Sequence, residues 1–182
     1  MKKEIEKKYL LKEGGKEYST KLLDKIFKNL SELERIVSKR GKIIKQGYLP
    51  LEYGKEICQL LGLPYEFSPV EVRLRQKGKE YFFTMKSQGV LSRDELPDVK
   101  ISKRLFDKYW PKTQGRRVEK IRLAQTFDSK HTEYKLEVDV YTDRDLVVAE
   151  VETGNEEEAS KLPKLGKDVT EDRKYKNKNL AR

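Results

Sequence analysis

Charged residues recur at a spacing of two in several strand-like segments of this chain. Glu4 and Glu6, Glu137 and Asp139, and Glu150 and Glu152 form acidic pairs, whereas Arg73 and Arg75, and Lys120 and Arg122, form basic pairs. Side chains at i and i+2 of a strand point to the same face, so each pair presents two like charges to one surface. Clustered carboxylates bind hard divalent cations, and clustered arginine and lysine side chains bind phosphate oxygens. A protein with both sets has what a metal-dependent polyphosphate site requires.

The composition is that of a highly charged chain that can still fold. Charged residues make up 40% and hydrophobic residues 36% of the 182 residues, with 10 tyrosines and 6 phenylalanines. This composition disfavours wholesale disorder, and the length suits a single domain over residues 1–182. The net charge of +10 indicates an anionic partner, but it does not choose between nucleic acid, a membrane surface and small phosphates.

Cysteine content and hydropathy predict a cytoplasmic protein. Cys58 is the single cysteine, which excludes an internal disulfide and a cysteine-rich zinc site and suits a reducing compartment. The N-terminal residues lack the apolar region of a signal peptide, and the chain has no apolar run of about 18 residues. We therefore expect no membrane partner.

The elements that must position the charges are mainly strands. Strands are expected over about residues 3–10, 43–49, 70–77, 80–87, 92–99, 115–125, 133–141 and 145–152. Helices are expected over Thr20–Lys39, Tyr53–Leu61 and Ser102–Trp110, and near the C-terminus over about 170–181. Lys77-Gly78-Lys79 is typical of a hairpin turn.

A charged sheet face cannot be an ordinary core. An antiparallel sheet that closes into a barrel with a polar interior resolves this conflict, because helices can cover its apolar outer face. The apolar residues that lie between the charged ones are expected to face those helices. These residues are Val72, Leu74, Val138, Val140 and Val151. A two-layer sheet with a solvated polar face is the alternative.

Taken together, these segments resemble the CYTH family of triphosphate tunnel metalloenzymes, and within it the compact bacterial tripolyphosphatases. The chain has the N-terminal E-x-E-x-K signature as Glu4, Glu6 and Lys8. VRLR, FTMKSQG, SRDE, EKIR, LEVDVY, AEVE and GKDVTEDRKYKN follow in family order. The resemblance implies a closed, eight-stranded antiparallel tunnel with a few flanking helices that holds a linear triphosphate.

The resemblance also implies roles for individual residues. Metal binding, by two Mg²⁺ or Mn²⁺ ions, is implied for Glu4, Glu6, Glu95, Glu137, Asp139, Glu150 and Glu152. Phosphate binding is implied for Lys8, Arg73, Arg75, Lys86, Arg93, Lys120 and Arg122. Glu6 or Glu152 is expected to orient or deprotonate the attacking water. The roles of two residues stay open. Tyr48 either faces the tunnel mouth or packs in the core, and Lys176 either reaches a phosphate or lies on a solvated helix.

Two features depart from the family pattern. Relatives often show R-x-E-x-E where this chain has Arg93-Asp94-Glu95-Leu96-Pro97, so the second acid is absent and Asp98 is one residue off register. A helical insertion is expected at about 14–42. An extra packing helix is one role for it; covering the tunnel wall, pairing subunits into a homodimer and binding another partner are the others.

The function expected from these residues is hydrolysis of inorganic tripolyphosphate, extending to nucleoside triphosphates. A class IV-type adenylate cyclase and a thiamine triphosphatase are alternatives that keep the fold. A polyphosphate- or RNA-binding barrel is the alternative outside the enzymes. Nucleic acid is disfavoured because no aromatic-rich RNA-binding motif is present and the bases alternate with acids.

Overall fold

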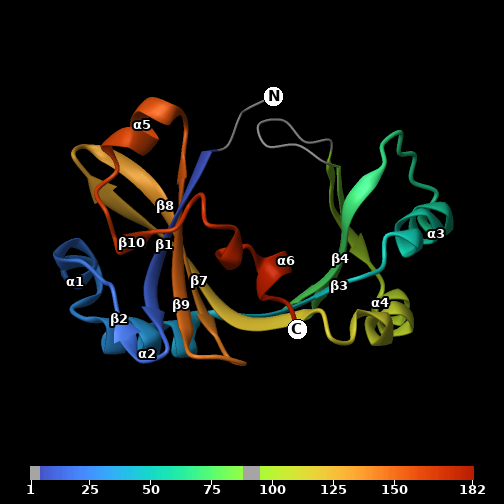
Figure 1. The fold of residues 1–182 in the computed structure, drawn as a ribbon, viewed down its shortest axis with the longest axis horizontal. Coiled ribbons are helices and arrows are strands. Elements are labelled where there is room, and N and C mark those ends of the chain that lie inside the picture. Colours follow the sequence, from blue (N-terminus) through green and yellow to red (C-terminus); the bar gives the residue numbers. More distant parts are fainter. Residues whose placement is uncertain (1–4, 88–94) are drawn as a thin grey trace. The chain divides into compact units, whose positions relative to one another are not determined.

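The chain folds into two compact units of mainly antiparallel strands with a few helices (Figure 1). A computed structural model describes residues 5–87 and 95–182. Unit 1 comprises Met1–Lys42 and Lys120–Tyr175, and unit 2 comprises Ile43–Glu119 and Lys176–Arg182. The mainly β class predicted from the sequence is confirmed.

The sheet of unit 1 contains the strands that carry most of the acidic pairs. Its strands are β1 (Ile5–Glu13), β2 (Lys16–Glu17), β7 (Arg117–Ser129, from Lys120 onward), β8 (Thr132–Tyr141), β9 (Leu146–Thr153) and β10 (Lys167–Asp168). They pair antiparallel in the order β10-β1-β9-β8-β7, and β2 also pairs with β1. Its helical segments are α1 (Lys21–Phe27), α2 (Leu30–Arg40), α5 (Glu156–Lys161) and η2 (Arg173–Tyr175).

The apolar side chains between the charges of unit 1 face its helices, as expected. Val138 and Val151 are fully buried in a cluster that includes Leu23 of α1 and Leu33 of α2, and Val140 packs against that cluster. Because strand side chains alternate, the charged residues between these valines lie on the opposite face of the sheet.

The helix predicted from Thr20 to Lys39 is two helices. Lys28 ends α1 with a φ of +76°, and Asn29 begins α2 by accepting a hydrogen bond from the Glu32 backbone N–H at 2.8 Å. Asparagine favours the N-cap position, where its side chain satisfies a free backbone donor. The apolar stripe continues through the break, which is why the periodicity predicted one helix.

Unit 2 contains the strands of the first basic pair. Its strands are β3 (Lys42–Tyr48, from Ile43 onward), β4 (Pro69–Lys77), β5 (Glu80–Ser87) and β6 (Glu95–Ile101), paired antiparallel in the order β3-β4-β5-β6. Its helical segments are α3 (Glu52–Leu61), α4 (Lys103–Tyr109), η1 (Trp110–Thr113) and α6 (Asn177–Leu180). The predicted hairpin is confirmed, with Gly78 at a φ of +60° between β4 and β5.

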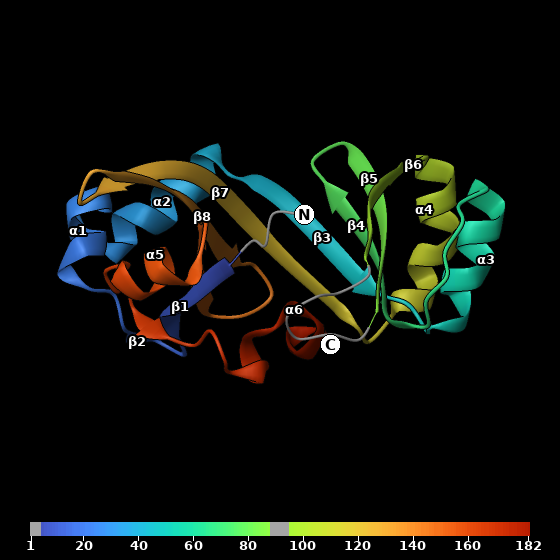
Figure 2. The same cartoon turned by 90° about the horizontal axis from the view of Figure 1, so that it is seen from above.

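Helices α3 and α4 lie side by side against the unit 2 sheet (Figure 2). Val72 and Leu74 of β4 are buried against Ile57 of α3 and Phe106 of α4, so this alternation is also confirmed. Ser102 accepts a hydrogen bond from the Leu105 backbone N–H at 3.1 Å and caps α4, as predicted.

The C-terminal helix predicted over 170–181 is shorter in the structure, where the turn η2 precedes the brief α6. Thr170 does not cap it, because its hydroxyl accepts a hydrogen bond from the Lys8 backbone N–H at 3.0 Å. Tyr175 is buried and donates its hydroxyl hydrogen to Glu13 at 2.9 Å. These contacts with β1 hold the segment in a conformation that a continuous helix could not adopt.

The predicted closed barrel is not confirmed, because within the described residues neither unit closes its own sheet. In residues 5–87 and 95–182, no helix is long and apolar enough to cross a membrane.

Candidate active site

The polar face of the unit 1 sheet brings together most of the charged residues singled out from the sequence. The register of β1 and β9 places Glu6 opposite Glu152, and Lys8 opposite Glu150. The register of β8 and β9 places Glu137 opposite Glu150. Cross-strand neighbours on one face lie close enough for their side chains to interact.

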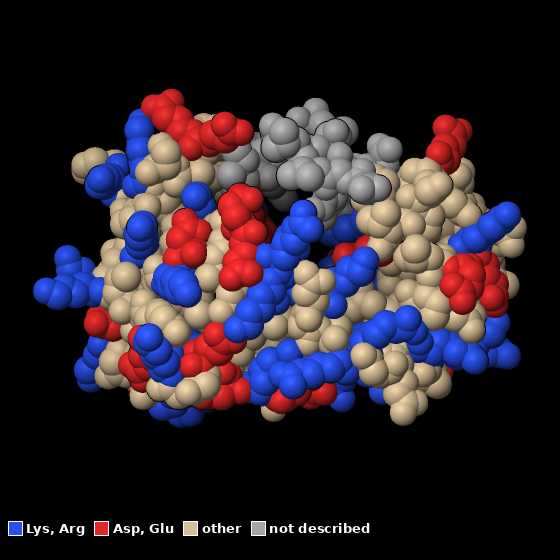
Figure 3. All heavy atoms as spheres, in the orientation of Figure 1, with Lys and Arg blue, Asp and Glu red and all other residues tan. Residues whose placement is uncertain are grey.

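Arg122 of β7 links three carboxylates on this face. Its guanidinium donates to Asp139 Oδ1 at 2.6 Å and to Glu150 Oε2 at 3.0 Å, and it contacts Glu137. Lys8 Nζ lies 2.7 Å from the other oxygen of Glu150. The site therefore holds its cations and its anions as one network. Over the visible outer surface of the molecule, lysine and arginine side chains are likewise mixed with aspartate and glutamate side chains (Figure 3).

Lys120 and Asp139 form a fully buried ion pair at 2.5 Å. Burial lowers the pKa of Lys120 and by itself would raise that of Asp139. Because Asp139 touches both Lys120 and Arg122, these charges outweigh burial and hold the pKa of Asp139 at about 2. Asp139 is therefore ionised near neutral pH and pairs with Lys120 as a carboxylate.

Asp139→Asn is expected to destabilise the protein by about 3–5 kcal/mol, because it leaves the buried Lys120 without its full counter-charge. For a chain of this size, the melting temperature should fall by about 6–20 °C in calorimetry. Asp143→Asn is the matched control, since Asp143 pairs with Arg144 at an exposed site. An Asp139→Asn melting temperature equal to that of the control would show that the buried pair contributes no stability.

Glu6 differs from the other acids because no ion pair holds it among the described residues. The pKa of Glu6 is raised to about 7, first by desolvation between the strands and second by the negative charge of Glu150. Because Glu6 also keeps an exposed surface, its burial is partial, and the nearby carboxylate of Glu150 adds to the shift. A carboxylate crowded by another carboxylate gains most from a nearby positive charge.

The acids of unit 1 suit a hard divalent cation by their chemistry. Glu6, Glu150 and Glu152 offer oxygen ligands from the neighbouring strands β1 and β9. Within the part of the chain that the structure describes, no three metal-ligating side chains are grouped around one point. Glu150 and Glu152 are instead paired with basic side chains, the latter with Lys135 at 3.0 Å. A cation bound at Glu6 would have to draw them away from these partners.

The basic pair of unit 2 is joined by an aspartate. Arg73 Nη2 lies 3.1 Å from Asp98 Oδ1, and Arg75 Nη2 contacts Asp98 Oδ2. Thr84 accepts a hydrogen bond from Arg73 at 3.1 Å and donates its own hydroxyl hydrogen to Asp98. Arg73 and Arg75 are mostly buried, whereas Asp98 keeps an exposed surface, so the network is accessible from the side of Asp98.

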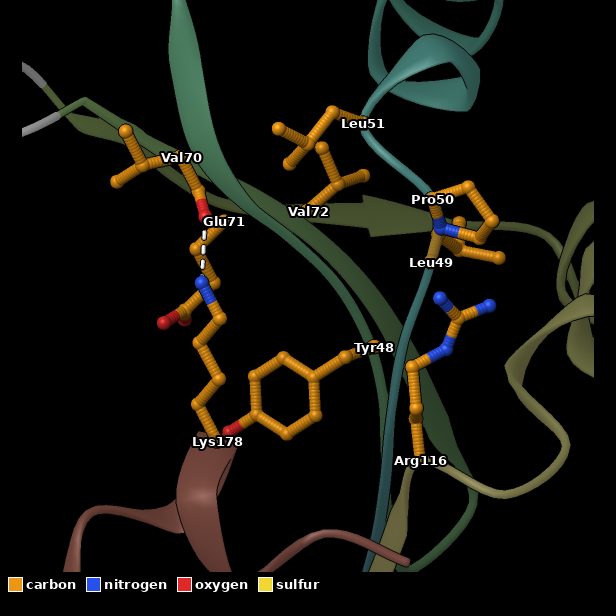
Figure 4. Close-up of a pocket in the computed structure, with 9 residues that line it drawn as sticks. All are labelled: Tyr48, Leu49, Pro50, Leu51, Val70, Glu71, Val72, Arg116 and Lys178. Atoms are coloured by element: carbon orange, nitrogen blue, oxygen red, sulfur yellow. Dashed lines mark hydrogen bonds between the residues drawn. The ribbon is translucent and has the colours of Figure 1, made fainter.

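Tyr48 is buried and lines a cavity of about 240 Å³ in unit 2 (Figure 4). Val70, Val72 and Arg116 also line this cavity, and Lys178 donates to the Val70 carbonyl at 2.7 Å. Burial first, and then the charge of Glu71, raise the pKa of the Tyr48 hydroxyl. The hydroxyl is therefore protonated near neutral pH, and it accepts a hydrogen bond from Gln46 at 2.8 Å.

The other residues predicted for the site lie outside the two networks described above or outside the described part of the chain. Lys86 is half-buried on β5, opposite Glu71 of β4. Lys176 is exposed and precedes α6. Glu4, Arg93 and the side chain of Glu95 lie outside the described residues.

The sequence reasoning missed three residues of these networks. Lys135 lies two residues from Glu137, the same spacing that identified the other charged pairs, so the sequence pattern could have identified it. Thr84 is uncharged, so a search for charged pairs could not find it. Asp98 was noted only as one residue off register.

The chain is similar to proteins of known name and structure. It is 44% identical over 118 residues to an inorganic triphosphatase of Nitrosomonas europaea, which is 62% of this chain and 75% of that protein. It matches the crystal structure of an inorganic triphosphatase with a TM-score of 0.59 and 30% identity, covering 100% of this chain and 95% of the other. A crystal structure of a hypothetical protein matches with a TM-score of 0.57 and 31% identity, covering 98% and 97%. No family model matches the chain.

Proposed function

The chain belongs to the family of the inorganic triphosphatase of Nitrosomonas europaea, and on this basis we propose that it hydrolyses inorganic tripolyphosphate to pyrophosphate and orthophosphate. One observation carries the proposal: the polar face of unit 1 sets Lys8 and Arg122 beside Glu150, next to Glu6, with Lys120 buried against Asp139. Phosphoryl transfer to water requires mainly positioning and neutralisation of charge. This face supplies cations for phosphate oxygens and carboxylates for a cation and water.

The basic side chains are proposed to bind the substrate. Arg122 and Lys8 share Glu150 as their counter-ion, so an arriving phosphate can take over donors that are already directed to one place. Lys120 is buried behind them and keeps Asp139 ionised, which in turn fixes the Arg122 guanidinium. Fixed donors of this kind bind phosphate without first having to be ordered.

The carboxylates are proposed to serve the metal and the attacking water. Glu6, Glu150 and Glu152, with Glu4, would hold Mg²⁺ or Mn²⁺, which supplies charge neutralisation and a more acidic water when bound. Glu6 or Glu152 is proposed to orient that water and accept its proton. Tyr48 of unit 2 is proposed to donate its hydroxyl hydrogen to a phosphate oxygen of the substrate.

The closed tunnel of the CYTH family is part of the proposal. Each unit supports it by itself, because each sheet turns its apolar face toward its own helices and its charged face away from them. In unit 2, Arg73, Arg75, Lys86 and Lys176 are proposed to bind phosphate oxygens of the substrate.

Phosphate release from a panel of substrates tests the proposed function. Tripolyphosphate, pyrophosphate, ATP, GTP and thiamine triphosphate are incubated with the protein and either Mg²⁺ or Mn²⁺. We expect tripolyphosphate to be hydrolysed with the highest kcat/KM, and ATP, where it reacts, to release orthophosphate. Formation of cyclic AMP and pyrophosphate, or no turnover of any substrate, would contradict the proposal.

A further inference from the structure

Asp98 reaches the polar face of unit 2 through an irregularity in the strand pairing. Phe83 of β5 pairs with Val99, and Met85 pairs with Leu96. Thr84 is thus the one residue of β5 that lies opposite two residues of β6, Pro97 and Asp98. This two-against-one arrangement is a β-bulge, which re-aims side chains and tolerates a proline without a backbone N–H. The bulge turns an aspartate that is out of register toward Arg73, since Thr84 itself pairs with Arg73.

At this position Asp98 contacts both arginines with separate oxygens. Oδ1 lies 3.1 Å from Arg73 Nη2 and also contacts the Thr84 hydroxyl, while Oδ2 contacts Arg75. Two guanidinium groups on one strand face repel each other, and a carboxylate between them removes that repulsion. Each guanidinium has five N–H donors, so the contacts with Asp98 leave other donors on each group for a ligand. The side chains of Arg73 and Arg75 keep a small exposed surface beside Asp98.

We propose that Asp98 is a positioning residue that holds Arg73 and Arg75 as a fixed pair for adjacent phosphates of the substrate. The inference rests on the proposed function and goes beyond the residues that the family resemblance implied. The alternative is a counter-anion that the substrate must displace. The two roles predict opposite changes in substrate affinity when Asp98 is replaced. Loss of a positioning residue weakens substrate binding, whereas loss of a competing anion strengthens it.

Asp98→Asn tests the proposal. An asparagine of similar size replaces one of the two carboxylate oxygens with an NH₂ donor, which cannot accept from the arginine that it faces, and it also removes the negative charge between the two guanidinium groups. We expect KM for tripolyphosphate to rise about tenfold while kcat changes less than about threefold. Calorimetric titration of tripolyphosphate in the presence of a chelator should show a parallel loss of affinity. Glu80→Gln is the matched control, because Glu80 forms an exposed ion pair with Lys100 across the same two strands.

A double mutant separates positioning from general damage to the fold. If Asp98 acts through Arg75, adding Asp98→Asn to Arg75→Ala should raise KM by less than about twofold further. Thr84→Val, which removes the hydroxyl that orients Asp98, should raise KM about threefold and keeps the test available if Asp98→Asn does not fold. An unchanged or lower KM and dissociation constant, or fully additive losses, would overturn the inference. Wild-type protein that neither binds nor hydrolyses tripolyphosphate would instead contradict the proposed function.

Discussion

Glu6→Gln is expected to lower tripolyphosphate turnover at least about 1,000-fold, a loss of about 4 kcal/mol in transition-state stabilisation. Glu6 faces Glu152 across β1 and β9, and no basic side chain neutralises it through an ion pair among the described residues. Glutamine keeps the shape but removes the negative charge that a hard cation needs from its oxygen ligands. Steady-state phosphate release over a range of Mg²⁺ and Mn²⁺ concentrations measures the loss.

The same substitution should leave the folded state intact or stabilise it. The pKa of Glu6 in the folded protein is about 7, above the ordinary value of 4.5. The folded state therefore binds more protons than the unfolded state between these values, so stability declines as pH rises through this window and is lowest, for this group, above pH 7. Because glutamine cannot ionise, the Glu6→Gln variant does not undergo this decline in stability. Thermal unfolding in chelator at pH 8 should show a melting temperature at or above that of the wild type.

Glu133→Gln is the matched control, because Glu133 is an exposed acid of β8. It should keep both turnover and melting temperature. Full activity of Glu6→Gln, or full activity of the wild type in excess chelator, would rule out the metal role assigned to Glu6.

Alternation along the strands was the part of the fold that could be predicted most directly. Val72 and Val138 lie between charged residues in the sequence and are buried under helices in the structure. A period of two assigns each side chain to a face, and burial then decides which face is the core. The hairpin at Gly78 was predictable from a local preference of the backbone, because glycine adopts the positive φ of such a turn without strain.

Features that depend on pairing between strands could not be predicted. Asp98 appeared out of register because the sequence does not reveal a bulge opposite Thr84. In the same way, the spacing of Lys120 and Asp139 gave no sign that they form a buried pair, since β7 and β8 first had to align. The break at Lys28 was hidden because the apolar stripe continues from α1 into α2.

The structure shows that the acidic and basic residues singled out from the sequence bind one another. The sequence suggested separate sets of metal ligands and phosphate ligands. In the structure, Glu150 binds Lys8 and Arg122, and Asp98 binds Arg73. Substrate and metal would therefore enter a network in which most charges already have partners, and the energy of breaking these ion pairs would offset part of the energy of binding.

Arg73→Ala and Arg75→Ala are each expected to lower kcat/KM for tripolyphosphate about 30- to 1,000-fold, while turnover of pyrophosphate changes far less. The two arginines point to one face of β4, with Cα atoms about 7 Å apart, so together they can bind successive phosphates of a longer chain. A charge-assisted contact of a mostly buried arginine contributes about 2–4 kcal/mol, which gives the stated range. Steady-state kinetics with both substrates measures the effect.

Lysine variants at these positions test the geometry of the contact. Arg73→Lys and Arg75→Lys should recover only part of the loss, because an ammonium group cannot form the two parallel hydrogen bonds that a guanidinium offers to a phosphate. Arg104→Ala, at an exposed position of α4 in the same unit, controls for the loss of one positive charge. If both alanine variants hydrolyse tripolyphosphate as efficiently as Arg104→Ala, Arg73 and Arg75 do not bind the substrate. In that case the contacts between Asp98 and the two arginines serve the stability of unit 2 alone.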